Sequence, residues 1–208
     1  MPMPCSKRRV AIADHERWFE DLPQELGPIP ESVTLSLLAS ALRNQDRFDE
    51  AAELASQALK SVLKARWSLV QLRHPFVCIL DTYLASPHPA RYAVQIEVAL
   101  AKLHRLAQRF PQAVPDDLLF HAISDWRFGN PQRAERTFRK SIAAANKLGL
   151  KSEHAIAQYW FGIFAHSPAG VPFVPEGPTP HLIAALNTFE QLKAAGLVAR
   201  IHTALETF

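Results

Sequence analysis

Cysteine and glycine are scarce in this chain of 208 residues. It has only two cysteines, Cys5 and Cys78, and two cannot form the disulfide framework that stabilises many small secreted proteins. We therefore expect a reducing, cytoplasmic location. The seven glycines are scattered, and no Gly-Lys-Ser or Gly-Lys-Thr sequence completes a phosphate-binding loop. The sequence therefore predicts no bound cofactor and no turnover of ATP or GTP.

Long apolar runs are also missing. The longest early run is VAIA at 10–13, which is far shorter than the apolar region of a signal peptide. No segment approaches the roughly 20 apolar residues of a membrane-spanning helix. The sequence therefore predicts no membrane association, while its 48% of hydrophobic residues is enough to bury a core.

Charge is nearly balanced, with 23 Lys and Arg against 20 Asp and Glu, a net charge of +3. The positive residues concentrate at 7–9 and 133–151. Nucleic-acid-binding domains usually carry a denser basic stripe together with a base-reading motif, so nucleic acid is not the expected partner. We interpret 133–151 as a solvated helix face, supported by an i,i+4 pair between Glu135 and Arg139.

Motifs for metal binding and catalysis are absent. The nine histidines include no His-Glu-x2-His, and no helical pair is evident that would bring two imidazoles together. Ser124 and Asp125, with His121 nearby, have the residue types of a nucleophile system. However, neighbours at i and i+1 on a helix point apart. The sequence therefore predicts no metal site, no catalytic residues and a protein that is not an enzyme.

Helical hairpins dominate the chain. In FGNPQRAERTFRKSIAAANKLGL, at 128–150, Gly129 can end one helix, Asn130 can cap the next, and Pro131 fits a first helical turn. The same layout precedes it at 35–59, where the turn is Asn44 to Arg47. No run shows the two-residue alternation of a strand over a useful length. These patterns predict an all-α fold.

The 16 prolines mark connections. Most lie in the first 30 residues, at a corner near 86–90 and between 168 and 180. We therefore expect an N-terminal arm over 1–31 and a helical repeat domain over 32–208. Within that domain, a proline-rich and exposed loop is predicted at 166–180, because five prolines there remove too many hydrogen-bond donors for a regular element.

The hairpins carry a resemblance to a known family. The pattern Leu-x2-Leu-Ala-x2-Leu, a turn, and Phe-x2-Ala-x3-Ala-x2-Ala-Leu at 35–59 resembles a tetratricopeptide repeat, a helical hairpin of about 34 residues. A second copy keeps Ala122, Gly129, Ala134 and Phe138, and a third is split by the proline-rich loop. The resemblance implies a right-handed array of hairpins, an α-solenoid.

A further likeness covers residues 32–205. The order of LHRLAQRFPQAVP, the 128–150 segment, SEHAIAQYWFGIFA and HLIAALNTFEQLKAAG is similar to the C-terminal helical region of bacterial multidomain signalling ATPases. Some of these proteins also carry a nucleotide cyclase or a protein kinase. The resemblance implies a scaffold or sensor region. Two alternatives remain: a detached regulatory tail of a cyclase, kinase or ATPase, and an accessory protein of transcription control.

A stacked array of hairpins leaves a concave face that usually binds peptides or partner proteins. We expect the first helix of each repeat to contribute two residues to such a groove. These residues are Arg43 and Asn44, Trp126 and Arg127, and Tyr159 and His166. The alternative interpretation is that Trp126 and Tyr159 are core residues and that the arginines are ordinary surface residues.

Overall fold

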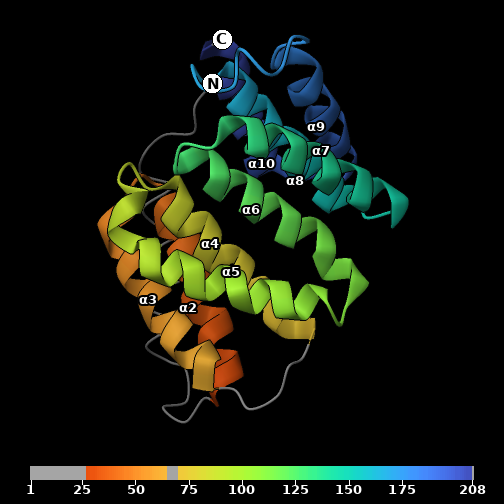
Figure 1. Cartoon of the computed structure of the whole chain (residues 1–208). Coiled ribbons are helices and arrows are strands. Elements are labelled where there is room, and N and C mark those ends of the chain that lie inside the picture. The colour runs from red at the N-terminus through yellow and green to blue at the C-terminus, as the bar shows by residue number, and fades with distance from the viewer. Residues whose placement is uncertain (1–26, 65–69, 208) are drawn as a thin grey trace. The chain divides into compact units, whose positions relative to one another are not determined.

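The computed structural model describes residues 27–64 and 70–207 and contains no strand within those ranges (Figure 1). The predicted all-α fold is therefore confirmed. Short 3-10 helices lie at Val70–Leu72, Pro89–Tyr92 and Pro111–Ala113. The α-helices are α2 (Pro28–Arg43), α3 (Phe48–Lys64), α4 (Arg73–Ala85), α5 (Ala93–Ala107), α6 (Val114–Arg127), α7 (Pro131–Lys147), α8 (Lys151–His166), α9 (Thr179–Gln191) and α10 (Ala195–Thr207).

The chain divides into two compact units, Met1–Ala99 and Leu100–Phe208, with the boundary inside α5. The arm predicted for 1–31 lies outside the described residues, except that α2 already begins at Pro28 rather than at Ser32. None of the helices in the described part of the chain is long and apolar enough to cross a lipid bilayer.

In the first unit, α2, α3 and α4 pack against one another. Helix α3 presents a row of small buried residues at four- and three-residue spacing, Ala51, Ala55 and Ala58, which allows neighbouring helices to approach closely. The hydroxyl groups of Ser56 and Tyr83 lie 2.9 Å apart and join α3 to α4. Burial of alanine faces therefore builds this core, as the 35–59 pattern predicts.

In the second unit, α6 and α7 form one hairpin, α8 and α9 form the next, and α10 packs on α9 (Figure 1). The core is aromatic. The ring of Phe138 on α7 lies 5.5 Å from that of Phe161 and 5.4 Å from that of Phe164, both on α8. These fully buried rings hold the two hairpins together, because each buries a large apolar area.

At the corner between α6 and α7, Gly129 and Pro131 have the predicted roles, and Asn130 does not. Gly129 has φ 91°, the left-handed conformation that glycine tolerates best, and the amide of Asn130 donates to the carbonyl of Asp125 at 2.7 Å. Pro131 occupies the first turn of α7. The prediction that the Asn130 side chain caps α7 is wrong, because that side chain makes no capping hydrogen bond.

The predicted proline-rich loop is present between the end of α8 at His166 and the start of α9 at Thr179. It is less exposed than predicted. Val174 is 2% exposed although Val171 is 60% exposed, and a Cβ on Gly170 would lie 1.9 Å from the carbonyl oxygen of Phe164. The loop is therefore held against the end of α8.

Helices α8 and α9 also approach closely at one point. A Cβ added to Gly162 would lie 2.7 Å from Cγ of Leu182, which is shorter than real Cβ contacts. Leu182 is fully buried. Glycine at this position therefore sets the distance between the two helices.

Candidate functional site

Arg43, predicted to line a groove, is instead part of the first unit's interior. Its side chain is 8% exposed, and its guanidinium lies 2.5 Å from the carboxylate of Asp81 on α4. Because α2 and α4 pack together, this ion pair fixes one helix to the other. Asn44 is exposed at the C-terminal end of α2, where its backbone amide donates to the carbonyl of Ser40 at 3.1 Å. Arg43 is therefore a packing residue.

Trp126 and Arg127 lie at the end of α6, and both are half-buried. The Trp126 ring meets Phe164 edge to face, with centroids 5.7 Å apart. The guanidinium carbon of Arg127 lies 5.9 Å from the Trp126 ring centroid, and burial lowers the pKa of Arg127. The Trp126–Arg127 pair therefore contacts the core through Phe164, and part of each side chain is exposed to solvent.

Tyr159 on α8 forms a similar pair with Arg200 on α10. The guanidinium of Arg200 donates to the Tyr159 hydroxyl at 3.3 Å and lies 5.2 Å from its ring centroid. Tyr159 also packs beside the buried cluster that includes Phe189. His166 is exposed at the end of α8. Four of the six predicted residues thus lie in the second unit, and the two aromatic ones each touch both an arginine and the core.

The basic face at 133–151 is as predicted in one respect. Arg139 forms the expected ion pair with Glu135. It also reaches Glu176 in the proline-rich loop, at 2.7 Å, and its guanidinium lies 5.1 Å from the ring of Phe161. Part of this face therefore ties α7 to the loop.

The structure also brings together three residues that sequence reasoning did not combine, His104, Asp117 and His121. Nδ1 of His104 lies 2.9 Å from Oδ2 of Asp117, and Nε2 of His121 lies 3.4 Å from Oδ1 of the same carboxylate. One possible ligand atom from each residue lies within 4.8 Å of the others. The expectation that no helical pair brings two imidazoles together is therefore wrong.

A weak signal for this cluster was present in the sequence. Asp117 and His121 are separated by one helical turn, so they share a face of α6. The second imidazole comes from α5, and a search for two histidines on one helix does not find it. The turn between α5 and α6, which contains Pro111, determines which residues of α5 face α6.

In comparisons with known proteins, no family model matches this chain, and no curated protein matches its sequence. The resemblance to tetratricopeptide repeats and to signalling ATPases therefore stays a prediction. The second unit contains three candidate sites: the half-buried pairs Trp126–Arg127 and Tyr159–Arg200, and the cluster of His104, Asp117 and His121.

Proposed function

We propose that this protein is a non-catalytic interaction module that binds a peptide or a partner protein through the surface formed by Trp126 and Arg127. One observation carries the proposal. The ring of Trp126 and the guanidinium of Arg127 lie side by side at the end of α6, and both side chains are half-exposed. Phe164 packs against the Trp126 ring. Rigid aromatic and arginine side chains of this kind provide most of the energy in many protein interfaces.

The packing of the second unit supports the proposal. Hairpin α6–α7 packs on hairpin α8–α9 in chain order, and α6 also contacts α8. This order of contacts is the one expected of a right-handed tetratricopeptide-like array, in which the first helix of each hairpin lines the binding face. In such an array the Tyr159–Arg200 pair would provide a second anchor on the same kind of surface.

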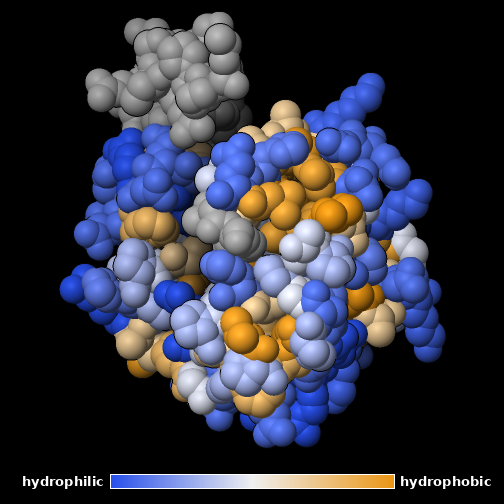
Figure 2. Space-filling model, turned by 90° about the horizontal axis from the view of Figure 1, so that it is seen from above, coloured by the Kyte–Doolittle hydropathy of each residue, from blue (hydrophilic) through white to orange (hydrophobic). Residues whose placement is uncertain are grey.

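A role in bacterial signalling, as a cytoplasmic scaffold or sensor, is proposed from the sequence resemblance alone. A detached regulatory tail of a cyclase, kinase or ATPase would use the same surface on a catalytic partner chain. An accessory role in transcription control would use it on a regulator. Hydrophobic surface on the face shown in Figure 2 occurs in separate patches surrounded by hydrophilic residues, and such patches commonly serve as contact points for partners.

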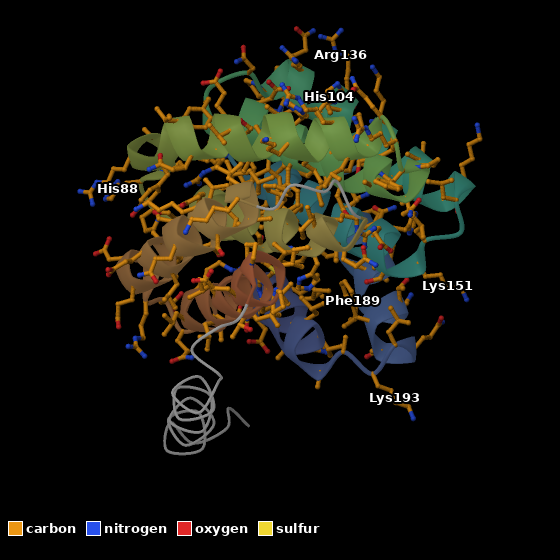
Figure 3. All side chains as sticks on the ribbon, turned by 90° about the horizontal axis from the view of Figure 1, so that it is seen from below. His88, His104, Arg136, Lys151, Phe189 and Lys193 are labelled. Atoms are coloured by element: carbon orange, nitrogen blue, oxygen red, sulfur yellow. The ribbon has the colours of Figure 1, made fainter. Side chains whose placement is uncertain are left out.

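The test is affinity capture from a lysate of the source organism with the full chain, followed by measurement of the affinity for the captured protein. Arg127→Ala should weaken that affinity roughly 30-fold, the effect of losing about 2 kcal/mol at an interface hot spot. Arg136→Ala is the matched control, because Arg136 on the neighbouring helix α7 is exposed and extends away from the protein (Figure 3).

Two results would contradict the proposal. Equal affinities of the Arg127 and Arg136 variants would remove the Trp126–Arg127 surface from the interface. Hydrolysis or cyclisation of ATP or GTP by two independent preparations, above a heat-killed control, would overturn the non-catalytic assignment. Trp126→Ala alone is not a clean test, because its ring also contacts Phe164, so its truncation removes core packing as well.

A further inference from the structure

We propose that His104, Asp117 and His121 form a binding site for a divalent transition-metal ion, with Zn²⁺ the ion that their chemistry fits best. All three residues lie in the second unit. This site is independent of the Trp126–Arg127 surface, and either proposal can fail without the other.

The positions of the three side chains suit a small metal ion. Two ligands of a tetrahedral zinc ion, each at about 2.0–2.1 Å from the metal, are about 3.4 Å apart. The distance from Nε2 of His121 to Oδ1 of Asp117 is 3.4 Å, and that from Nδ1 of His104 to Oδ2 is 2.9 Å. The two imidazole rings stand nearly perpendicular, with centroids 6.2 Å apart. The ligand atoms thus converge from both helices on a shared carboxylate.

Of the three residues, Asp117 is the one with a buried side-chain atom that lacks a hydrogen-bond partner. Its side chain is 8% exposed, and its Oδ1 atom is buried with no hydrogen-bond donor. A buried carboxylate oxygen without a donor costs free energy. Within residues 27–64 and 70–207, no lysine or arginine forms an ion pair with this carboxylate; its neighbours are the imidazoles of His104 and His121. A divalent cation placed between the carboxylate and the imidazoles would provide the missing interaction.

The surroundings of His104 also resemble those of a histidine that binds a metal ion. Its second ring nitrogen, Nε2, lies 3.2 Å from the side-chain amide of Gln108, one turn further along α5. Histidines that bind a metal commonly hold their other ring nitrogen against a hydrogen-bonding partner, which fixes the orientation of the ring. A turn of the Gln108 amide would present its oxygen as the acceptor for an Nε2–H group.

Access to the site is open, because the side chains of His104 and His121 are 53% and 38% exposed. Figure 3 marks His104 on α5. Two imidazoles and one carboxylate leave at least one coordination position for water or for a group from a partner molecule. Imidazole and carboxylate together favour zinc over calcium or magnesium, which prefer oxygen ligands alone.

The experiment uses the full chain without a histidine tag, stripped with a chelator and then titrated with Zn²⁺ in competition with a chromophoric chelator of micromolar affinity. The wild type should bind one equivalent and should gain thermal stability on binding, because a ligand of the folded state stabilises it. Co²⁺ in place of Zn²⁺ should give visible absorption from a site with nitrogen and oxygen ligands.

Single variants assign the ligands. His104→Ala and His121→Ala should each weaken Zn²⁺ binding about 100-fold or more and remove the Co²⁺ absorption, since the loss of even an outer-shell partner costs 10–100-fold. Both side chains are substantially exposed, so both variants should fold. Asp117→Asn keeps the shape of the carboxylate but not its charge, and should act in the same direction.

His202→Ala is the matched control, because His202 is an exposed histidine on α10, outside the cluster. It should bind Zn²⁺ as the wild type does. The proposal is overturned if the wild type binds no Zn²⁺ under this competition, or if His104→Ala and His121→Ala bind it within about threefold of the wild type. Either outcome would mean that the cluster is a hydrogen-bonded group of side chains without a metal.

Discussion

The ion pair between Arg43 and Asp81 allows a quantitative test of the first unit. Arg43 is 8% exposed and Asp81 is 18% exposed, so both charges have lost most of their hydration. Nε of Arg43 has no hydrogen-bond partner, and the Asp81 carboxylate is the acidic partner of this guanidinium. We therefore expect Asp81→Ala to leave a buried positive charge without compensation.

Removal of one partner from a buried ion pair typically costs 3–5 kcal/mol, because the remaining charge stays desolvated. For a protein of this size, about 1 kcal/mol shifts the melting temperature by roughly 2–4 °C. Asp81→Ala should therefore lower it by roughly 6–20 °C. The double variant Arg43→Met with Asp81→Leu replaces both charges by apolar groups and should recover most of the loss, since such replacements are often neutral.

Urea unfolding of the wild type, Arg43→Met, Asp81→Leu and the double variant, followed by far-ultraviolet circular dichroism, gives the coupling free energy between the two positions. Glu50→Ala is the control. Glu50 pairs with Arg47 on the exposed surface, and exposed pairs of this kind contribute little to stability. A stability loss for Asp81→Ala no larger than that of the control, or a double variant less stable than either single one, would refute the reasoning.

Three further predictions follow from burial and close contacts. Burial lowers the pKa of His181 from its ordinary 6.5, although Glu176 opposes the shift; the unfolded chain therefore takes up the proton first. The free energy of unfolding should fall as the pH drops below about 6.5, and His181→Gln should reduce this slope in urea titrations. Gly170→Ala forces a Cβ against a backbone carbonyl and should destabilise the chain by roughly 3 kcal/mol or more, whereas Gly196→Ala, with nothing within 4 Å, should not. Burial raises the pKa of Cys78 to about 11, so alkylation at pH 8, followed by mass spectrometry, should be roughly 100-fold slower in the folded than in the unfolded chain.

The helices and their corners could be predicted from the sequence, because they depend on residues close together along the chain. Gly129 and Pro131 specify the α6–α7 corner by their own backbone preferences. Small residues at three- and four-residue spacing identify the buried face of α3. Local rules therefore predicted the helical class and the corners at 44–47 and 129–131.

The candidate sites could not be predicted in the same way, because they depend on which helices become neighbours. The repeat pattern predicts that Arg43 lines a groove. In the structure, Arg43 instead forms an ion pair with Asp81, far along the chain, and is buried where α2 packs against α4. His104 meets Asp117 only because of the turn between α5 and α6. Side-chain partners of this kind are set by tertiary packing, which a single sequence does not encode in any local pattern.

The close approach of α8 and α9 at Gly162 has a consequence for evolution. A leucine fits at position 182 because residue 162 is a glycine and has no Cβ at this contact. Natural variation should therefore treat the two positions as one unit: a lineage that acquires alanine at 162 should also carry a smaller side chain at 182. An alignment of relatives would show this as paired change at two sites that are well separated in sequence.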